Sequence, residues 1–284
     1  MRNQWAGVKG AEVNCGNGLW AICTIDPCPS TRALIARLIV TIDNSADQLK
    51  FKRLTLVFYM SLPRFFHPQL PLQGEVALDD QEARHASNVL RLACGADVVL
   101  FDGQGGEALG KVATLDKRRV TVSILNRSDG NRELPRPLEL LVALPKGDRQ
   151  KTLVDGLVQL GVTRLTPLIC QRGVAQPTAS ALERLQRSVV ESSKQCGRNQ
   201  LLAISPPQTI SQAISLATEV NQVGQRALRC VAHPYGTTQS LRDLAGGLAA
   251  QATAAHFAVG PEGGFSETEI ELWSRGGWPS IDLG

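Results

Sequence analysis

The sequence contains no segment that approaches the roughly 18 uninterrupted apolar residues of a membrane-spanning helix. The nearest run, residues 33–42, is about half that length and includes Arg37. The beginning of the chain also lacks a charged leader followed by a clean apolar run, so no secretory signal is expected. These absences predict a cytoplasmic protein that does not associate with a membrane.

Cysteines are scattered, and no C-x-x-C pair or histidine at zinc-finger spacing accompanies them. The count of seven is odd, which does not fit a disulfide framework. We therefore expect free thiols in a reducing compartment and no metal site.

The positive charge is small and unevenly distributed. The formal net charge is +4, and three of these four units come from residues 1–59. Net charge alone therefore does not argue for RNA binding, and only local clusters of basic residues can do so.

Residues 1–59 show no sustained period of 2 or 3.6 and are interrupted by glycine and proline. The two methionines of the chain are Met1 and Met60, and regular patterning begins at Met60. We expect residues 1–59 to be a non-native or disordered extension. The alternative is a lineage-specific extension that is largely disordered or only locally folded.

Residues 60–134 show short apolar alternations and one helical pattern that are typical of a small β-barrel domain. The expected elements are strands at 75–78, 97–102, 108–114 and 119–124 and a helix at 81–89.

Residues 135–284 begin with the linker prolines Pro135 and Pro137 and then alternate between strand and helix patterns. The expected strands are 138–144, 164–170, 227–232, 254–260 and 280–283, and the expected helices are 148–160, 181–196, 210–217, 239–250 and 266–275. This alternation predicts an α/β domain with a parallel sheet that is covered on both faces.

One loop of the second domain has the composition of a ligand-binding turn. Gly260-Pro261-Glu262-Gly263-Gly264 directly follows an expected strand, and ligands of parallel sheets bind beyond the carboxyl ends of strands. Its glycines permit positive φ angles and let the main chain lie flat against an adenosine, while Glu262 could hold a ribose hydroxyl. The alternative is a tight turn without a ligand. The loop is neither a dinucleotide fingerprint nor a P-loop.

Several ordered stretches resemble the ribosomal RNA small subunit methyltransferase E family. They are Met60–His67, His85–Leu92, Phe101–Gly103, Lys146–Arg149, Leu160–Val162, Thr166–Leu168, Gln195–Asn199, His233–Pro234 and Gly260–Gly264. The resemblance implies a PUA-like RNA-binding domain at 60–134 and a SPOUT-type trefoil-knot methyltransferase domain at 135–284. It further implies a homodimer, the cofactor S-adenosylmethionine, and methylation of N3 of a uridine in 16S rRNA of the small ribosomal subunit.

The resemblance also assigns site residues by position. The implied cofactor-binding residues are His233, Pro234, Gly260, Pro261, Glu262, Gly263, Gly264, Leu283 and Gly284. Candidate uridine or RNA contacts are Arg172, Gln195 and Arg198. Candidate phosphate-binding residues are Arg64, Arg84, Arg91, Lys146 and Arg149. For each basic residue, a solvated surface charge or a helix-end contact is the alternative.

The chain departs from the family at its end, because the family continues beyond Leu283-Gly284 with an arginine-containing run and a final helix. We therefore expect an incomplete knot, a cofactor pocket that lacks one wall, a missing dimer helix, and main catalytic arginines beyond Gly284. Lys194 stands where the family commonly has an acidic or small residue.

Three alternatives remain open from the sequence. The chain could be a catalytically inactive RNA-binding fragment of such an enzyme, or a SPOUT methyltransferase with another RNA substrate. A non-RNA nucleotide-binding α/β protein would explain the glycine-rich loop but not the small first domain.

Overall fold

The computed structural model describes residues 62–116, 119–129, 132–222, 227–233, 240 and 252–282, and the backbone of four strands between residues 8 and 59. The chain divides into two compact units, Met1–Pro63 and Arg64–Gly284. Among the described residues, no helix has the length and apolar character needed to cross a membrane.

The first unit contains two antiparallel pairs of strands. They are β1 (Val8–Cys15) with β2 (Gly18–Ile25), and β3 (Ile35–Ile42) with β4 (Phe51–Tyr59). The expectation that residues 1–59 are a non-native extension stays a prediction.

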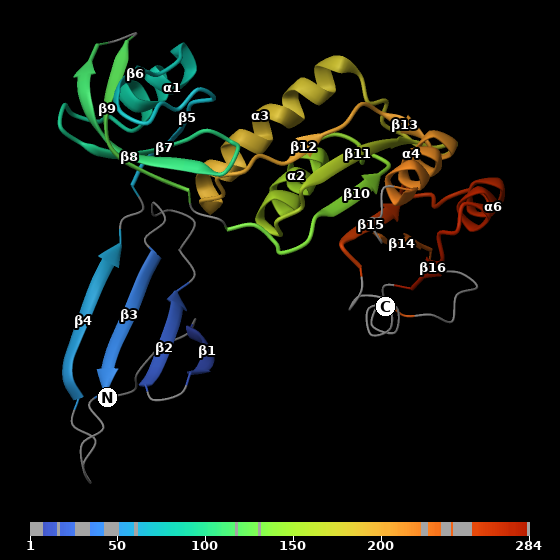
Figure 1. Cartoon of the computed structure of the whole chain (residues 1–284), viewed down its shortest axis with the longest axis horizontal. Helices are drawn as coiled ribbons and strands as arrows, with labels where there is room; N and C mark the ends of the chain where they lie inside the picture. The colour runs from blue at the N-terminus through green and yellow to red at the C-terminus, as the bar shows by residue number, and fades with distance from the viewer. Residues whose placement is uncertain are drawn as a thin grey trace. The chain divides into compact units, whose positions relative to one another are not determined.

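The second unit begins with a small domain, residues 64–129, which is built on a five-stranded sheet (Figure 1). Its strands are β5 (Arg64–Phe66), β6 (Gly74–Ala77), β7 (Asp97–Phe101), β8 (Gly106–Leu115) and β9 (Val120–Asp129). The order is β5-β7-β8-β9-β6, with β5 parallel to β7 and the other pairs antiparallel. In the described part of this domain, β5 and β6 are the sheet edges, so closure into a barrel stays a prediction.

Side-chain alternation explains the core of the small domain. Along β8, Ala108 and Val112 are buried while Leu109 and Lys111 between them are exposed. This period of two puts alternate residues on one apolar face. Helix α1 (Asp80–Arg84) covers the sheet and continues into a π-helical turn, His85–Val89.

The parallel-sheet domain, residues 132–282, alternates strands and helices as the sequence predicted (Figure 1). Its elements are β10 (Leu138–Val142), α2 (Arg149–Gln159), β11 (Arg164–Ile169), α3 (Ala179–Cys196), β12 (Ala203–Ile204), β13 (Gln208–Thr209), α4 (Ile210–Gln222), β14 (Ala227–Ala232), β15 (Ala254–Val259), α6 (Glu267–Arg275) and β16 (Ser280–Ile281). The order is β12-β11-β10-β15-β14-β16, every pair is parallel, and β13 also pairs with β11. The predicted parallel α/β sheet is confirmed.

Helices cover both faces of this sheet. Val142 packs with residues of α2 and α3 in one core cluster. Its neighbour Leu141 packs with residues of α4 and α6 in another. Adjacent residues of a strand point to opposite faces, so the two clusters lie on opposite sides of the sheet. Apart from residue 240, the predicted helix at 239–250 lies outside the described residues. The knot stays a prediction.

A row of charged and polar side chains crosses the sheet near the amino ends of four strands. Glu139 of β10 lies opposite Arg164 of β11 on one side and His256 of β15 on the other. His256 in turn lies opposite Arg229 of β14. Because laterally paired residues share a face, this row interrupts the apolar cover expected of a buried parallel sheet. The sequence reading did not identify it.

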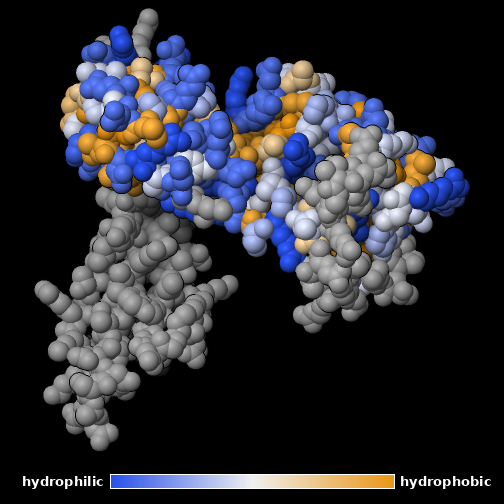
Figure 2. All heavy atoms as spheres, viewed as in Figure 1, coloured by the Kyte–Doolittle hydropathy of each residue, from blue (hydrophilic) through white to orange (hydrophobic). Residues whose placement is uncertain are grey.

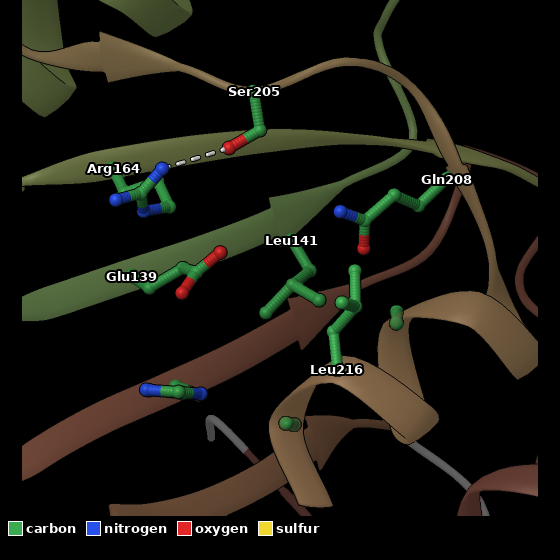
Figure 3. A pocket seen from close by; sticks show the side chains of 9 residues that line it. Glu139, Leu141, Arg164, Ser205, Gln208 and Leu216 are labelled. Atoms are coloured by element: carbon green, nitrogen blue, oxygen red, sulfur yellow. Dashed lines mark hydrogen bonds between the residues drawn. The ribbon is translucent and has the colours of Figure 1, made fainter. Parts of the chain in front are cut away.

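The row borders a pocket of about 210 Å³ beneath α4. Figure 3 shows that Glu139 and Arg164 enter it from neighbouring strands and that Leu216 faces them. Arg164 Nη1 donates to Ser205 Oγ at 3.2 Å, and Thr166 Oγ1 donates to Glu139 Oε1 at 2.7 Å. Polar partners therefore compensate part of the cost of placing these charges in the fold.

Burial of His256 predicts an acid-dependent loss of stability. Burial lowers the pKa of the His256 imidazole, Glu139 opposes this shift, and Arg229 and Arg164 reinforce it. The folded state thus favours neutral His256. The contribution of this residue to the free energy of unfolding is complete above the unfolded pKa of about 6.5. It is lost as the pH falls through the lower folded pKa. Between pH 7.5 and 5, urea unfolding should show a steeper loss of stability for the wild type than for His256→Asn, and parallel pH profiles would contradict the argument.

Candidate functional site

The carboxyl ends of β14 and β15 lie side by side and carry the loop that begins with His233 and the predicted glycine-rich loop. The strands pair in register up to Ala232 opposite Val259, and His233 and Gly260 follow them directly. Both loops line one cavity of about 630 Å³, and Arg172, which follows β11, lines it as well. The structure thus brings His233, Arg172 and residues 260–264 together. Pro234, Leu283 and Gly284 lie outside the described residues.

The glycine-rich loop is compact and leaves its main chain uncovered. Gly264 has φ of +71°, and its N–H donates to the Pro261 carbonyl oxygen at 2.8 Å. A Cβ atom on Gly260 would lie 3.0 Å from the Phe265 ring, and that ring is buried in the core. A side chain at Gly260 would therefore clash with the core, and a side chain at Gly264 would strain the backbone.

Two arginines contact this loop, Arg172 after β11 and Arg149 at the start of α2. Arg172 Nη1 donates to the Gly263 carbonyl oxygen at 3.0 Å, and Arg149 forms an exposed ion pair with Glu262 at 3.6 Å. The exposed pair contributes little to stability. The Arg172 bond places a permanent cation on the cavity wall, where it can interact with a bound ligand.

The sequence reading missed a buried carboxylate that ties the site together. Glu269 Oε1 accepts from the Gln171 N–H at 2.7 Å, and Glu269 Oε2 accepts from the Ser266 N–H at 2.8 Å. Ser266 and Glu269 form a capping box at the start of α6, and Glu269 also bonds to the segment after β11, 98 positions away. This bond fixes the backbone that carries Arg172 relative to the glycine-rich loop.

Cys170 lies two residues before Arg172. Burial, with a smaller contribution from Glu269, raises the pKa of the Cys170 thiol to about 12, so it stays protonated at neutral pH. No group of three or more His, Cys, Asp or Glu side chains in the described part of the chain could hold a metal ion.

Arg64, predicted to bind RNA phosphate, is instead used inside the protein. Its side chain is 11 % exposed and pairs with Glu107 at 3.2 Å. Its second terminal nitrogen donates to Asn199 Oδ1 at 2.6 Å, and the guanidinium lies 5.0 Å from the centroid of the Phe101 ring. The sequence showed a charge near the start of the domain but could not show that folding buries it.

Arg198, predicted to contact uridine or RNA, also has an internal role. It is 5 % exposed, and its guanidinium pairs with Glu133 of the linker at 2.5 Å. Arg198 Nη1 also donates to the Val162 carbonyl oxygen at 2.7 Å. These bonds join the linker to the end of α2 and the start of β11, and they leave no free donor face for RNA.

The remaining predicted RNA contacts are solvent-exposed. They are Arg84, Arg91, Lys146, Arg149 and Gln195. On the face in view, Figure 2 shows hydrophilic residues interspersed with apolar ones. Exposure is compatible with phosphate binding, and the role of these residues stays a prediction.

Comparison with protein families gives two adjacent matches within the second unit. Residues 132–284 match the family described as RNA methyltransferase domain. Residues 78–125 match the family described as RNA methyltransferase PUA domain. The predicted resemblance is confirmed for both parts of residues 64–284.

Two curated relatives of this chain have the same name. A Synechocystis protein named ribosomal RNA small subunit methyltransferase E is 29 % identical over 227 residues, which cover 80 % of this chain and 72 % of that protein. A Rickettsia conorii protein of the same name is 29 % identical over 211 residues, which cover 72 % of this chain and 80 % of that protein.

Solved structures share the architecture. The ribosomal RNA small subunit methyltransferase E of Neisseria gonorrhoeae, bound to S-adenosylmethionine, aligns with a TM-score of 0.69 and 28 % identity over 78 % of this chain and 89 % of that one. A Legionella pneumophila methyltransferase in complex with the same cofactor aligns with a TM-score of 0.71 and 27 % identity over 79 % and 90 % of the two chains.

Proposed function

Because the chain belongs to the RNA methyltransferase domain family, we propose that it transfers a methyl group from S-adenosylmethionine to an rRNA base. We further propose N3 of a uridine in 16S rRNA of the small ribosomal subunit as the target. The observation that carries this proposal is the single cavity shared by His233, Arg172 and the Gly260–Gly264 loop. Relatives named for small-subunit rRNA support the choice of substrate.

The cavity fits an adenosyl cofactor in size and chemistry. Its volume of about 630 Å³ lies within the range of small-molecule sites. Three of its lining residues are glycines, so main-chain N–H and C=O groups can approach an adenine edge without obstruction. The carboxylates of Glu262 and Glu267 also line it and are suited to accept hydrogen bonds from ribose hydroxyls.

When bound, the cofactor supplies an electrophilic methyl group on its sulfonium. The protein must then present a uridine N3 that has lost, or is losing, its weakly acidic proton. Holding the base in line is expected to supply much of the rate. Arg172, which is fixed by its bond to Gly263, is suited to stabilise the negative charge that develops on the uracil ring.

RNA binding is assigned to the exposed basic residues of both domains. Arg84 and Arg91 lie on the small domain, and Lys146 and Arg149 follow the first strand of the parallel sheet. Lysine and arginine side chains bind phosphates and position RNA without reading its sequence. We extend the proposal to action in the cytoplasm and to a homodimer for the full-length family, with residues 60–134 and 135–284 as the functional domains and residues 1–59 as a non-native or disordered extension.

Two measurements on the full chain test this function. Titration calorimetry should detect binding of S-adenosylmethionine. Incubation with labelled cofactor and small ribosomal subunits that lack the modification should label 16S rRNA at one uridine N3, identified by mass spectrometry, and short free oligonucleotides should remain unlabelled. Cofactor binding with labelling of another RNA would replace the substrate, and failure to bind the cofactor would contradict the proposal.

A further inference from the structure

Lys194, near the end of α3, forms a buried ion pair across the domain boundary. Its Nζ lies 2.5 Å from Glu82 Oε1, and the two side chains are 8 % and 5 % exposed. Lys194 belongs to the parallel-sheet domain and Glu82 to α1 of the small domain. The pair therefore joins the two domains through charges that solvent hardly reaches.

Each partner depends on the other for compensation. Burial raises the pKa of Glu82, and the neighbouring Lys194 ammonium and, to a smaller extent, the Phe66 backbone oppose this effect. Glu82 Oε2 has no hydrogen-bond partner within the described residues. Lys194 has a second carboxylate partner, Glu191, at 2.9 Å, but that side chain is 42 % exposed. Removal of Lys194 would leave a buried carboxylate without a cationic partner, which is far more costly than loss of a surface pair.

Several other contacts between the domains lie just after α3, and α3 itself also contacts β5. Asn199 accepts from Arg64, and the Gly197 carbonyl oxygen accepts from Arg132 of the linker at 2.6 Å. The Leu201 N–H donates to the Gly103 carbonyl oxygen at 2.9 Å. These contacts attach β5, the turn after β7 and the linker to one short segment. The bond from Lys194 to α1 adds an attachment to a different element of the small domain, and this attachment opposes rotation of that domain.

We propose that the Lys194–Glu82 pair is a positioning contact that holds α1 in one orientation relative to the cofactor cavity. Arg84 lies two residues beyond Glu82 on the same helix and is exposed. The pair thus determines the position of the target base when the RNA is bound by the small domain. This proposal rests on the proposed function, since it concerns the placement of the RNA substrate.

Steady-state kinetics on small ribosomal subunits test the positioning role. We expect Lys194→Met to raise the KM for the subunit by about tenfold, because a buried charge loses its partner and the small domain loses its fixed orientation. The Kd for S-adenosylmethionine should stay within about twofold of the wild type. Glu82→Gln should have a similar effect, and the double variant should lose much less than the product of the two single effects.

A control on the same helix separates the buried pair from loss of positive charge. Arg187 pairs with Glu183 on the surface of α3, and the two side chains are 70 % and 66 % exposed. Arg187→Met should leave both constants close to the wild type. An unchanged KM in Lys194→Met, a parallel loss of cofactor affinity, or fully multiplicative effects in the double variant would overturn the proposal.

A distance measurement tests the orientation without relying on catalysis. Spin labels introduced through unnatural amino acids at the exposed residues Asn88 and Gln186 report on the separation of the two domains. We expect a narrow distance distribution in the wild type and Arg187→Met, and a broader one in Lys194→Met. An equally narrow distribution in Lys194→Met would refute the positioning contact, even if the wild type methylates a different RNA or none.

Discussion

Replacement of Gly264 with valine is expected to weaken S-adenosylmethionine binding by about 10- to 100-fold, because the loop would lose its folded shape. Gly264 has φ of +71°, a conformation that β-branched residues adopt only with strain. The loop can relieve the strain only by moving its main chain away from the positions that line the cavity. Titration calorimetry with the purified variant measures the change directly.

Gly95→Val is the matched control for this substitution. Gly95 has φ of +84°, and a Cβ atom there would meet nothing within 4 Å, as at Gly264. It lies in the small domain, in the turn before β7, so the variant carries similar backbone strain without touching the cavity. Equal loss of cofactor affinity in both variants, or retained affinity in Gly264→Val, would show that the glycine-rich loop does not bind the cofactor.

Replacement of Arg172 with methionine is expected to slow methyl transfer by about 10²- to 10³-fold at saturating cofactor and RNA. The guanidinium lines the cavity and is held by its bond to the Gly263 carbonyl oxygen. Methionine keeps much of the side-chain length but removes the cation that would stabilise the developing uridine anion. Single-turnover labelling of small ribosomal subunits isolates the chemical step from product release.

Arg275→Met controls for loss of an arginine in the same domain. Arg275 lies at the end of α6, where it forms an exposed pair with Glu271 at 3.2 Å. Its replacement should leave the single-turnover rate nearly unchanged. If Arg172→Met also transfers methyl groups at nearly the wild-type rate, Arg172 has no role in the transition state and only braces the loop.

The sequence predicted the fold well where local patterning determines structure. The apolar runs of β10, β14 and β15 and the capping box of α6 are local signals, and each element formed near its predicted bounds. The strands β5, β12 and β13 were missed because two or three residues are too few to show a period. These strands form because partners distant in the chain supply hydrogen bonds.

The site was only partly predictable, for a related reason. The sequence identified the loop and His233, because strand ends of a parallel sheet meet at one edge. It did not distinguish exposed basic residues from Arg64 and Arg198, whose partners Asn199 and Glu133 lie 135 and 65 positions away. Burial and pairing over such separations follow from tertiary packing, which composition and spacing do not encode.

The position of β15 in the sheet constrains how the chain folds during synthesis. It lies between β10 and β14, although it follows both in the chain. Until residue 259 has left the ribosome, the inner edges of β10 and β14 have no partner, and a newly made chain exposes two apolar strand edges. Such edges favour aggregation. The nascent protein should therefore require chaperone protection until β15 has been translated, and its folding should accelerate abruptly once β15 emerges.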